Sequence, residues 1–208
     1  MVECRSTDRR LRFGIGDCRL GLRIALRFGG MAAALLVAPG CLVVSVQPIH
    51  DRDAIVWEPA LIGEWNNAED NASMTIERGE WQSYRIHYVH PIETGHLTGY
   101  LTTIGKTRFL DVMPGRGEDR GSFLVPVHVA LRVNLEADQL EMTGLSYDWF
   151  FDRLRTKTGV PGLAVVLDEK ENALIVSPST AVRAWIARQP ADGKMFGASS
   201  TFTRRRGG

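Results

Sequence analysis

The chain has 208 residues, of which 44% are hydrophobic and 24% charged, and this balance excludes a disordered or fibrous protein. Its net charge of +1 is the sum of two unlike parts. Residues 1–40 carry seven arginines against three acidic residues, whereas the rest of the chain carries 18 basic and 21 acidic side chains. Because this second part is mildly acidic, we do not expect nucleic-acid binding.

The stretch from residue 28 to residue 46 is apolar apart from Ser45 and follows two arginines. A basic segment, an apolar run and small residues before a cleavage point are typical of a secretory signal peptide. Here the small residues lead into a cysteine, and Ala38-Pro39-Gly40-Cys41 resembles the bacterial lipobox. The resemblance implies cleavage after Gly40 and a diacylglycerol on the sulfur of Cys41. Since Leu42 follows the cysteine rather than aspartate, it also implies the outer membrane if the bacterium is Gram-negative.

Two other interpretations of this stretch stay open. It approaches the roughly 20 apolar residues of a spanning helix, so an uncleaved membrane anchor is one alternative, and a buried core segment is the other. Residues 1–21 lack a periodic pattern, which a misassigned upstream start codon would explain. We therefore expect a leader at residues 1–40, a lipidated tether at 41–60 and a single β-rich domain at 61–206. The mature part keeps Cys41 alone, which excludes an internal disulfide.

The domain begins with a series of short β patterns. In chain order, strands are predicted at residues 61–65, 73–77, 82–89, 97–104, 108–113, 123–135 and 139–143. In the third of these strands, Tyr84 and Ile86 share one face, and His87 lies on the other. Gly105 indicates a tight turn between the fourth and fifth strands.

The segment 123–135 shows the clearest strand pattern. Its odd positions from Phe123 to Leu135, including Val125 and Val127, are all apolar, which predicts one face fully in the core. His128 lies alone on the opposite, polar face. A structural hydrogen bond is the favoured role for this histidine. A hydrolase would need a nucleophile beside it, such as Ser83 or Ser122, and the sequence does not indicate that pairing.

Two helices interrupt the β pattern near the C-terminus. Ser146 can cap a helix whose apolar stripe runs from Tyr147 to Leu154. A second helix follows Ser177 and Pro178, after a hairpin at residues 163–176, and residues 201–203 suit a closing strand. The expected fold is mainly β (α+β), an antiparallel meander forming a small barrel or curved sheet, with two amphipathic C-terminal helices at its edge or mouth.

Gly63-Glu64-Trp65, near the start of the β domain, resembles the Gly-x-Trp opening of lipocalins. That resemblance implies that Trp65 plugs the floor of a barrel and packs on a late arginine, for which Arg204 and Arg205 are the candidates. The alternative is an ordinary core tryptophan. The second lipocalin motif is not evident, and two helices replace the usual one.

The histidines His87, His90 and His96 lie close together in sequence, and imidazole is a common ligand of zinc and copper. On a continued strand, however, His87 and His90 would face opposite sides, and Glu93 is the one carboxylate nearby. We interpret them as surface or turn histidines, with a metal site as the weaker alternative. No pair of carboxylates is spaced as acid–base or glycosidase chemistry requires, and no cofactor is expected.

Several short sequences spread over residues 40–206 resemble, in the same order, a family of small, uncharacterised bacterial lipoproteins. They are Gly40-Cys41-Leu42, Val46-Gln47-Pro48-Ile49, the segment 57–65, Phe109-Leu110-Asp111, Val125-Pro126-Val127-His128, Tyr147-Asp148-Trp149-Phe150 and Phe196-Gly197. The resemblance implies a lipoprotein with a single domain and brings no catalytic residues.

The sequence thus predicts a lipid-anchored protein of the bacterial cell envelope, most simply a non-enzymatic binding or scaffolding lipoprotein. One alternative is a lipocalin-like carrier that holds an apolar small molecule in its barrel. The other is an envelope hydrolase using His128. The expected partners are membrane lipid, through acylated Cys41, and an apolar small molecule or an envelope protein. The residues expected at a ligand site or in the core are Trp65, Tyr84, Ile86 and His128.

Overall fold

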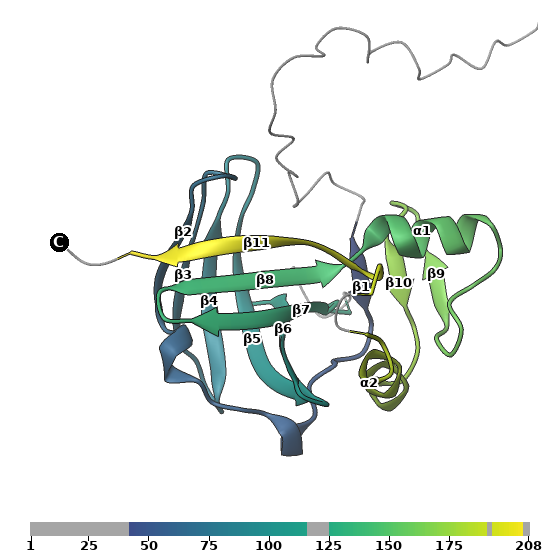
Figure 1. The fold of residues 1–208 in the computed structure, drawn as a ribbon, viewed down its shortest axis with the longest axis horizontal. Helices are drawn as coiled ribbons and strands as arrows, with labels where there is room; N and C mark the ends of the chain where they lie inside the picture. Colours follow the sequence, from purple (N-terminus) through teal and green to yellow (C-terminus); the bar gives the residue numbers. More distant parts are fainter. Residues whose placement is uncertain (1–41, 116–124, 191–192, 206–208) are drawn as a thin grey trace, which may run out of the picture. The chain divides into compact units, whose positions relative to one another are not determined.

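A computed structural model describes residues 42–115, 125–190 and 193–205 of the protein (Figure 1). The expected leader at residues 1–40, the lipidation site Cys41, the candidate nucleophile Ser122, and Phe123 of the sixth predicted strand lie outside the described residues.

The described part of the chain contains eight strands that close into an antiparallel barrel, which confirms the predicted barrel. Around the barrel, each strand pairs with its neighbour in sequence, and β11 closes the sheet between β8 and β2. The strands are β2 (Gly63–Asn67), β3 (Ala72–Arg78), β4 (Ser83–Val89), β5 (Thr94–Ile104), β6 (Thr107–Pro114), β7 (Val129–Glu136), β8 (Gln139–Leu145) and β11 (Phe196–Arg204).

The alternation of side chains explains why these segments form a barrel wall. In β4, Tyr84 and Ile86 are buried inside the barrel and Arg85 is exposed outside, as predicted. The turn between β5 and β6 places Gly105 at a φ of +63°, a conformation that glycine adopts without a steric cost. These short reversals fix the register of the antiparallel pairs.

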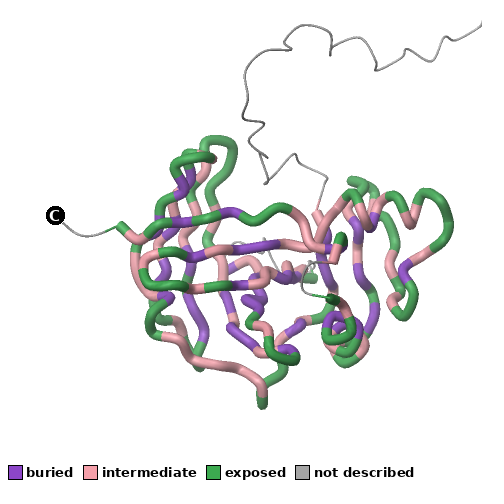
Figure 2. Tube along the Cα trace, viewed as in Figure 1, coloured by how far each residue is buried: buried purple, intermediate pink, exposed green. Residues whose placement is uncertain are grey.

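A second, smaller layer packs against the outside of the barrel. Its sheet has the order β1-β10-β9, formed by β1 (Val43–Ser45), β10 (Ala173–Ile175) and β9 (Val165–Leu167), with β1 parallel to β10. The described residues also form the two predicted helices, α1 (Tyr147–Arg155) and α2 (Ser179–Ala187). Phe150 and Trp185 from these helices share a buried core with Phe109 of the barrel wall. Buried residues therefore occur both in the barrel and in the smaller layer of three strands and two helices (Figure 2).

Residues 46–62, which include most of the tether expected at 41–60, lie along the barrel wall and include the short 3-10 helices η1 (Arg52–Ala54) and η2 (Pro59–Leu61). Ser45 and His128 exchange two backbone hydrogen bonds of 2.8 Å, and the Val56 amide donates to the Leu101 carbonyl at 2.8 Å. This segment is therefore tied to the outer face of the barrel from β1 onward.

The strand predicted at residues 123–135 differs from the observed one. β7 begins at Val129, and Val125 is 72% exposed rather than inside the barrel. The physical reason is that Pro126 has no amide hydrogen to donate to a strand ladder, and His128 pairs with Ser45 of β1 instead of continuing β7. The alternating apolar pattern therefore begins several residues before the observed strand β7 does.

In the described part of the chain, neither helix reaches the length and apolarity that crossing a membrane requires.

Candidate functional site

One end of the barrel, which we call the floor, is closed by tightly bonded residues. Trp65 is fully buried there, and its indole Nε1 donates to the Leu61 carbonyl at 2.9 Å. The guanidinium of Arg204 lies 4.2 Å from the centre of the Trp65 ring and donates to the carbonyls of Ile62 and Ala60. This is the arrangement that the lipocalin resemblance implies, with Arg204 as the late arginine. Arg205 instead contacts Glu64.

Tyr84 completes the floor. Its hydroxyl donates to the Glu58 carbonyl at 3.1 Å and accepts from the Glu58 amide at 2.8 Å, and Trp57 stacks on its ring at 4.8 Å. Burial raises the pKa of Tyr84 above its ordinary value, against the opposing effect of the hydrogen bond from Glu58. The segment before β2 therefore covers this end of the barrel and uses the polar groups of both aromatic residues.

The opposite half of the barrel is hollow. A cavity of about 710 Å³ lies between the strands and opens at the end where β4, β6 and β8 finish, which we call the mouth. This volume is within the range of about 300–1,000 Å³ typical of small-molecule sites. Its wall is mostly apolar and includes Met74, Ile86, Leu97, Leu110, Val112, Val129, Leu131, Met142 and Phe202.

Gly144 shows directly that the cavity has spare room. It lies on β8 and lines the cavity, and a Cβ atom added there would meet only Leu131 Cδ2, at 3.8 Å. By contrast, a Cβ on Gly99 of β5 would approach Ile86 and Leu110 to 3.0 and 3.1 Å. The barrel wall is therefore tight at one glycine and open at the other.

Four residues with hydroxyl groups belong to the lining of the cavity, namely Tyr88 and Ser200 on the barrel strands and Ser146 and Tyr147 at the start of α1. Burial, and to a lesser extent Glu93 and Asp70, raises the pKa of Tyr88 to about 12, so this phenol stays a neutral donor. Glu93 and Asp148 add exposed carboxylates at the mouth. The cavity thus offers an apolar body with a few polar groups that can orient a ligand.

A separate polar cluster lies on the outer face of the barrel. Asp111 of β6 is completely buried, and its Oδ2 accepts hydrogen bonds from the amides of Ile49 and His50 at 2.8 and 3.1 Å. The Nδ1 atoms of His50 and His128 lie 2.7 and 2.9 Å from the two carboxylate oxygens. The His50 ring also stacks on Tyr100, with ring centres 4.4 Å apart. One carboxylate therefore holds the segment around residue 50 against the barrel wall.

Burial alone would raise the pKa of Asp111, but the hydrogen bonds from His128 and His50 outweigh it, and the pKa lies below its ordinary value. The three side chains place potential metal-ligand atoms within 4.8 Å of one another. A metal ion there would have to replace hydrogen bonds that already satisfy both carboxylate oxygens, because Oδ2 alone accepts three. The cluster therefore fits a structural anchor better than a metal centre.

The candidate nucleophile Ser83 does not meet His128 in this arrangement. It lies at the start of β4, near the floor, and donates its hydroxyl hydrogen to the Glu80 carbonyl. The serine that forms a β-bridge with His128 is Ser45, and its hydroxyl hydrogen-bonds to the backbone of Gln47. His128 makes the structural hydrogen bond that was the favoured prediction, although it is buried rather than on an exposed polar face.

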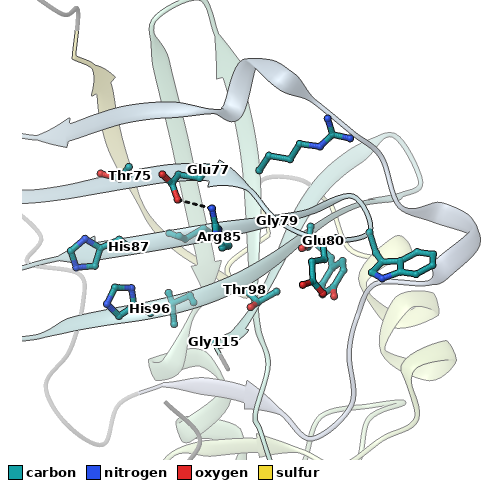
Figure 3. A pocket seen from close by; sticks show the side chains of 15 residues that line it. Thr75, Glu77, Gly79, Glu80, Arg85, His87, His96, Thr98 and Gly115 are labelled. Carbon is teal, nitrogen blue, oxygen red and sulfur yellow. Dashed lines mark hydrogen bonds and ion pairs between the residues drawn. The ribbon is translucent and has the colours of Figure 1, made fainter. Parts of the chain in front are cut away.

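A groove of about 870 Å³ lies along the outer face of β3, β4 and β5 (Figure 3). His87 and His96 lie side by side in it, with their rings stacked at 4.5 Å, and nearby Arg85 contacts Glu77 at 3.2 Å. His90 is in the following turn, where its Nδ1 accepts from the Ile92 amide. The fold thus brings together two of the three candidate histidines, because β4 and β5 pair residue 87 with residue 96.

Sequence reasoning missed the Asp111 cluster, because its members come from three separate segments. A signal was available: Asp111 interrupts an otherwise apolar strand pattern, and a carboxylate in such a position requires hydrogen-bond donors. Comparison of the chain with protein-family models, with curated proteins and with solved structures finds no match.

Proposed function

We propose that the protein is a lipid-anchored carrier of the bacterial cell envelope and binds an apolar small molecule in its barrel. The observation that supports binding is the 710 Å³ apolar cavity behind a sealed floor. The lipobox resemblance at Cys41 supports the anchor. A surface-acting scaffold would be the simpler interpretation of a filled barrel, so the hollow interior favours carriage.

The lining of the cavity narrows the class of ligand. Its described residues include no lysine, arginine or histidine, so a ligand carboxylate would be buried without a cation to pair with it. Met74 and Met142 provide flexible walls that adapt to ligand shape. We therefore expect a neutral molecule with an apolar body and one polar group that contacts the hydroxyl of Tyr88 or Ser200.

Filling the cavity from the protein side tests this proposal. In Gly144→Leu, the new side chain enters the free space near Leu131 and should weaken binding of the fluorescent apolar probe N-phenyl-1-naphthylamine about tenfold or more. Thr201→Leu is the matched control, because Thr201 is exposed on the outer face of β11. Fluorescence titration of both variants gives the dissociation constants. Equal affinities in Gly144→Leu and the unmodified protein, or no probe binding at all, would contradict carriage in the barrel.

The anchor needs an independent test. Metabolic labelling with a palmitate analogue should mark the full chain, and Cys41→Ser should abolish the label. Equal labelling of the two chains would overturn the lipid-anchored part of the proposal and leave the cavity assay unaffected.

A further inference from the structure

Three exposed apolar side chains lie near the mouth of the barrel. We call Val89, Ile92 and Val125 the apolar rim. Val89 ends β4, Ile92 is 70% exposed in the turn that follows, and Val125 is 72% exposed before β7. Their close neighbours in sequence, Glu93 and Val127, line the cavity, so the rim residues lie at its opening. Side chains of this size in contact with water favour an apolar partner.

The chain enters the described structure at the same place. Leu42 is the first described residue and lines the cavity at the mouth. Its position is fixed, because its amide donates to the Asn172 side chain at 3.2 Å and its carbonyl accepts from the Ala173 amide at 2.9 Å. Consecutive Cα atoms are about 3.8 Å apart, so a lipid on Cys41, as the lipobox resemblance implies, would join the chain one residue before Leu42.

From these two observations we infer that the apolar rim docks on the lipid bilayer and that the mouth of the barrel faces the membrane. The inference rests on the proposed function and adds a route to it: an apolar ligand passes between bilayer and cavity without crossing bulk water. Because Glu93 and Asp148 carry negative charge at the mouth, the surface suits zwitterionic rather than anionic lipid.

The floor provides an internal control for this docking. Trp81 is 90% exposed in the turn between β3 and β4, at the end of the barrel away from the mouth. It is larger and more exposed than any rim residue. If exposure of apolar groups alone governed membrane contact, Trp81 would insert as readily as Ile92. If the orientation is fixed as we infer, Trp81 stays in water.

The experiment uses the mature lipidated chain from Cys41 onward, in which the lipid occupies the one native cysteine, in vesicles of phosphatidylcholine and phosphatidylethanolamine. A single cysteine introduced by Ile92→Cys, Val125→Cys or Trp81→Cys carries the environment-sensitive fluorophore NBD. Lipids spin-labelled near the headgroup should quench the label at 92 and 125 about twofold, because interfacial apolar groups lie about 5–10 Å deep. The label at 81 should not be quenched. Equal quenching at all three positions, or quenching at 81 alone, would overturn the inference.

A second measurement separates this inference from the proposed function. Transfer of N-phenyl-1-naphthylamine from the protein to acceptor vesicles should become faster as vesicle concentration rises, and Ile92→Glu should slow that transfer about tenfold while leaving the probe's affinity unchanged. A transfer rate that is independent of vesicle concentration, with binding intact, would refute the docking of the mouth and leave carriage standing. A chain that docks but binds no probe would refute carriage instead.

Discussion

The same strands enclose the two halves of the barrel interior, but the half at the floor is filled and the half at the mouth is hollow. At the floor, the large side chains of Trp65 and Tyr84 fill the space, and their polar atoms bond to the backbone of residues 58–61. At the mouth, Gly144 and Ser200 leave the space open, and Tyr88 is part of the cavity lining. The comparison teaches that the choice of side chains, rather than the strand architecture, decides where a closed barrel is solid and where it can hold a ligand.

Stability should follow the same division. Closely packed atoms contribute dispersion contacts that an empty cavity lacks, so the floor and the buried outer layer should carry most of the folding free energy. Substitutions in the hollow half should change the free energy of unfolding less and should instead change the affinity for a ligand.

The floor should be the most sensitive position. Trp65→Ala removes a fully buried indole and its contact with Arg204, and we expect a loss of about 4 kcal/mol in the free energy of unfolding. Urea denaturation measures this loss. Trp81→Ala, at an exposed tryptophan, serves as the control and should change stability by less than about 0.5 kcal/mol. Similar losses in the two variants would show that the floor is not a distinct stabilising unit.

The outer anchor should come next. Asp111→Ala leaves the amides of Ile49 and His50 and two imidazole groups without their acceptor, and we expect a loss of about 3 kcal/mol. Asp53→Ala, on the same covering segment but exposed, should be close to neutral. Both values come from urea denaturation at neutral pH. An Asp111→Ala protein as stable as the Asp53→Ala protein would mean that the segment is held without this carboxylate.

The pH dependence of stability gives a finer test of the same anchor. The pKa of Asp111 is lowered in the folded chain, so its stabilisation is fully present above the unfolded value near 3.8 and is lost as the pH falls through the folded value. Stability should therefore fall below about pH 4 in the unmodified protein and less steeply in Asp111→Asn. Denaturation midpoints at several acidic pH values provide the comparison, and identical slopes in the two proteins would contradict it.

The smallest effect should be found in the hollow half. Because the pKa of Tyr88 is raised to about 12, its contribution is fully present below the unfolded value of 10.0 and is lost as the pH rises between these two values. Tyr88→Phe should therefore flatten the alkaline decline in stability slightly. The variant should also bind a ligand that accepts a hydrogen bond about five- to tenfold more weakly, since one hydrogen bond contributes about 1 kcal/mol. Unchanged affinity for hexadecanal, with the unmodified protein as reference, would show that Tyr88 does not contact the ligand.

Local patterns in the sequence predict the parts of this fold that depend on local physics. Each of these patterns involves residues that are close in sequence: the alternation in 82–89, the apolar helix face after the N-cap Ser146, and the turn at Gly105. The structure confirms the barrel and the two helices. The same pattern extends too far before β7, because hydropathy does not register that Pro126 lacks a donor.

The parts that sequence could not predict depend on distant partners. The Asp111 cluster joins Asp111 to His50, 61 positions away, and to His128, 17 positions away. Nothing in the sequence near Asp111 specifies these partners. The hollow interior is also non-local, because it is set by the summed volume of side chains from many strands. Trp65 and Arg204 form a partial exception: they are far apart in sequence, but the Gly-x-Trp resemblance implied that Trp65 packs on a late arginine, with Arg204 and Arg205 as the candidates.

The closure of the barrel by β11 has a consequence for how the protein is made. β2 pairs with β11, and β1 pairs with β10. Strands from the start of the domain therefore stay unpaired on one edge until segments near its end have been synthesised. Pairings of such long sequence separation form slowly. A nascent chain, or one truncated before Phe196, would present the unpaired edges of β2 and β8, which are templates for aggregation. Synthesis must therefore be nearly finished before all strand edges of the barrel are paired, and a chaperone that shields strand edges would act during this interval.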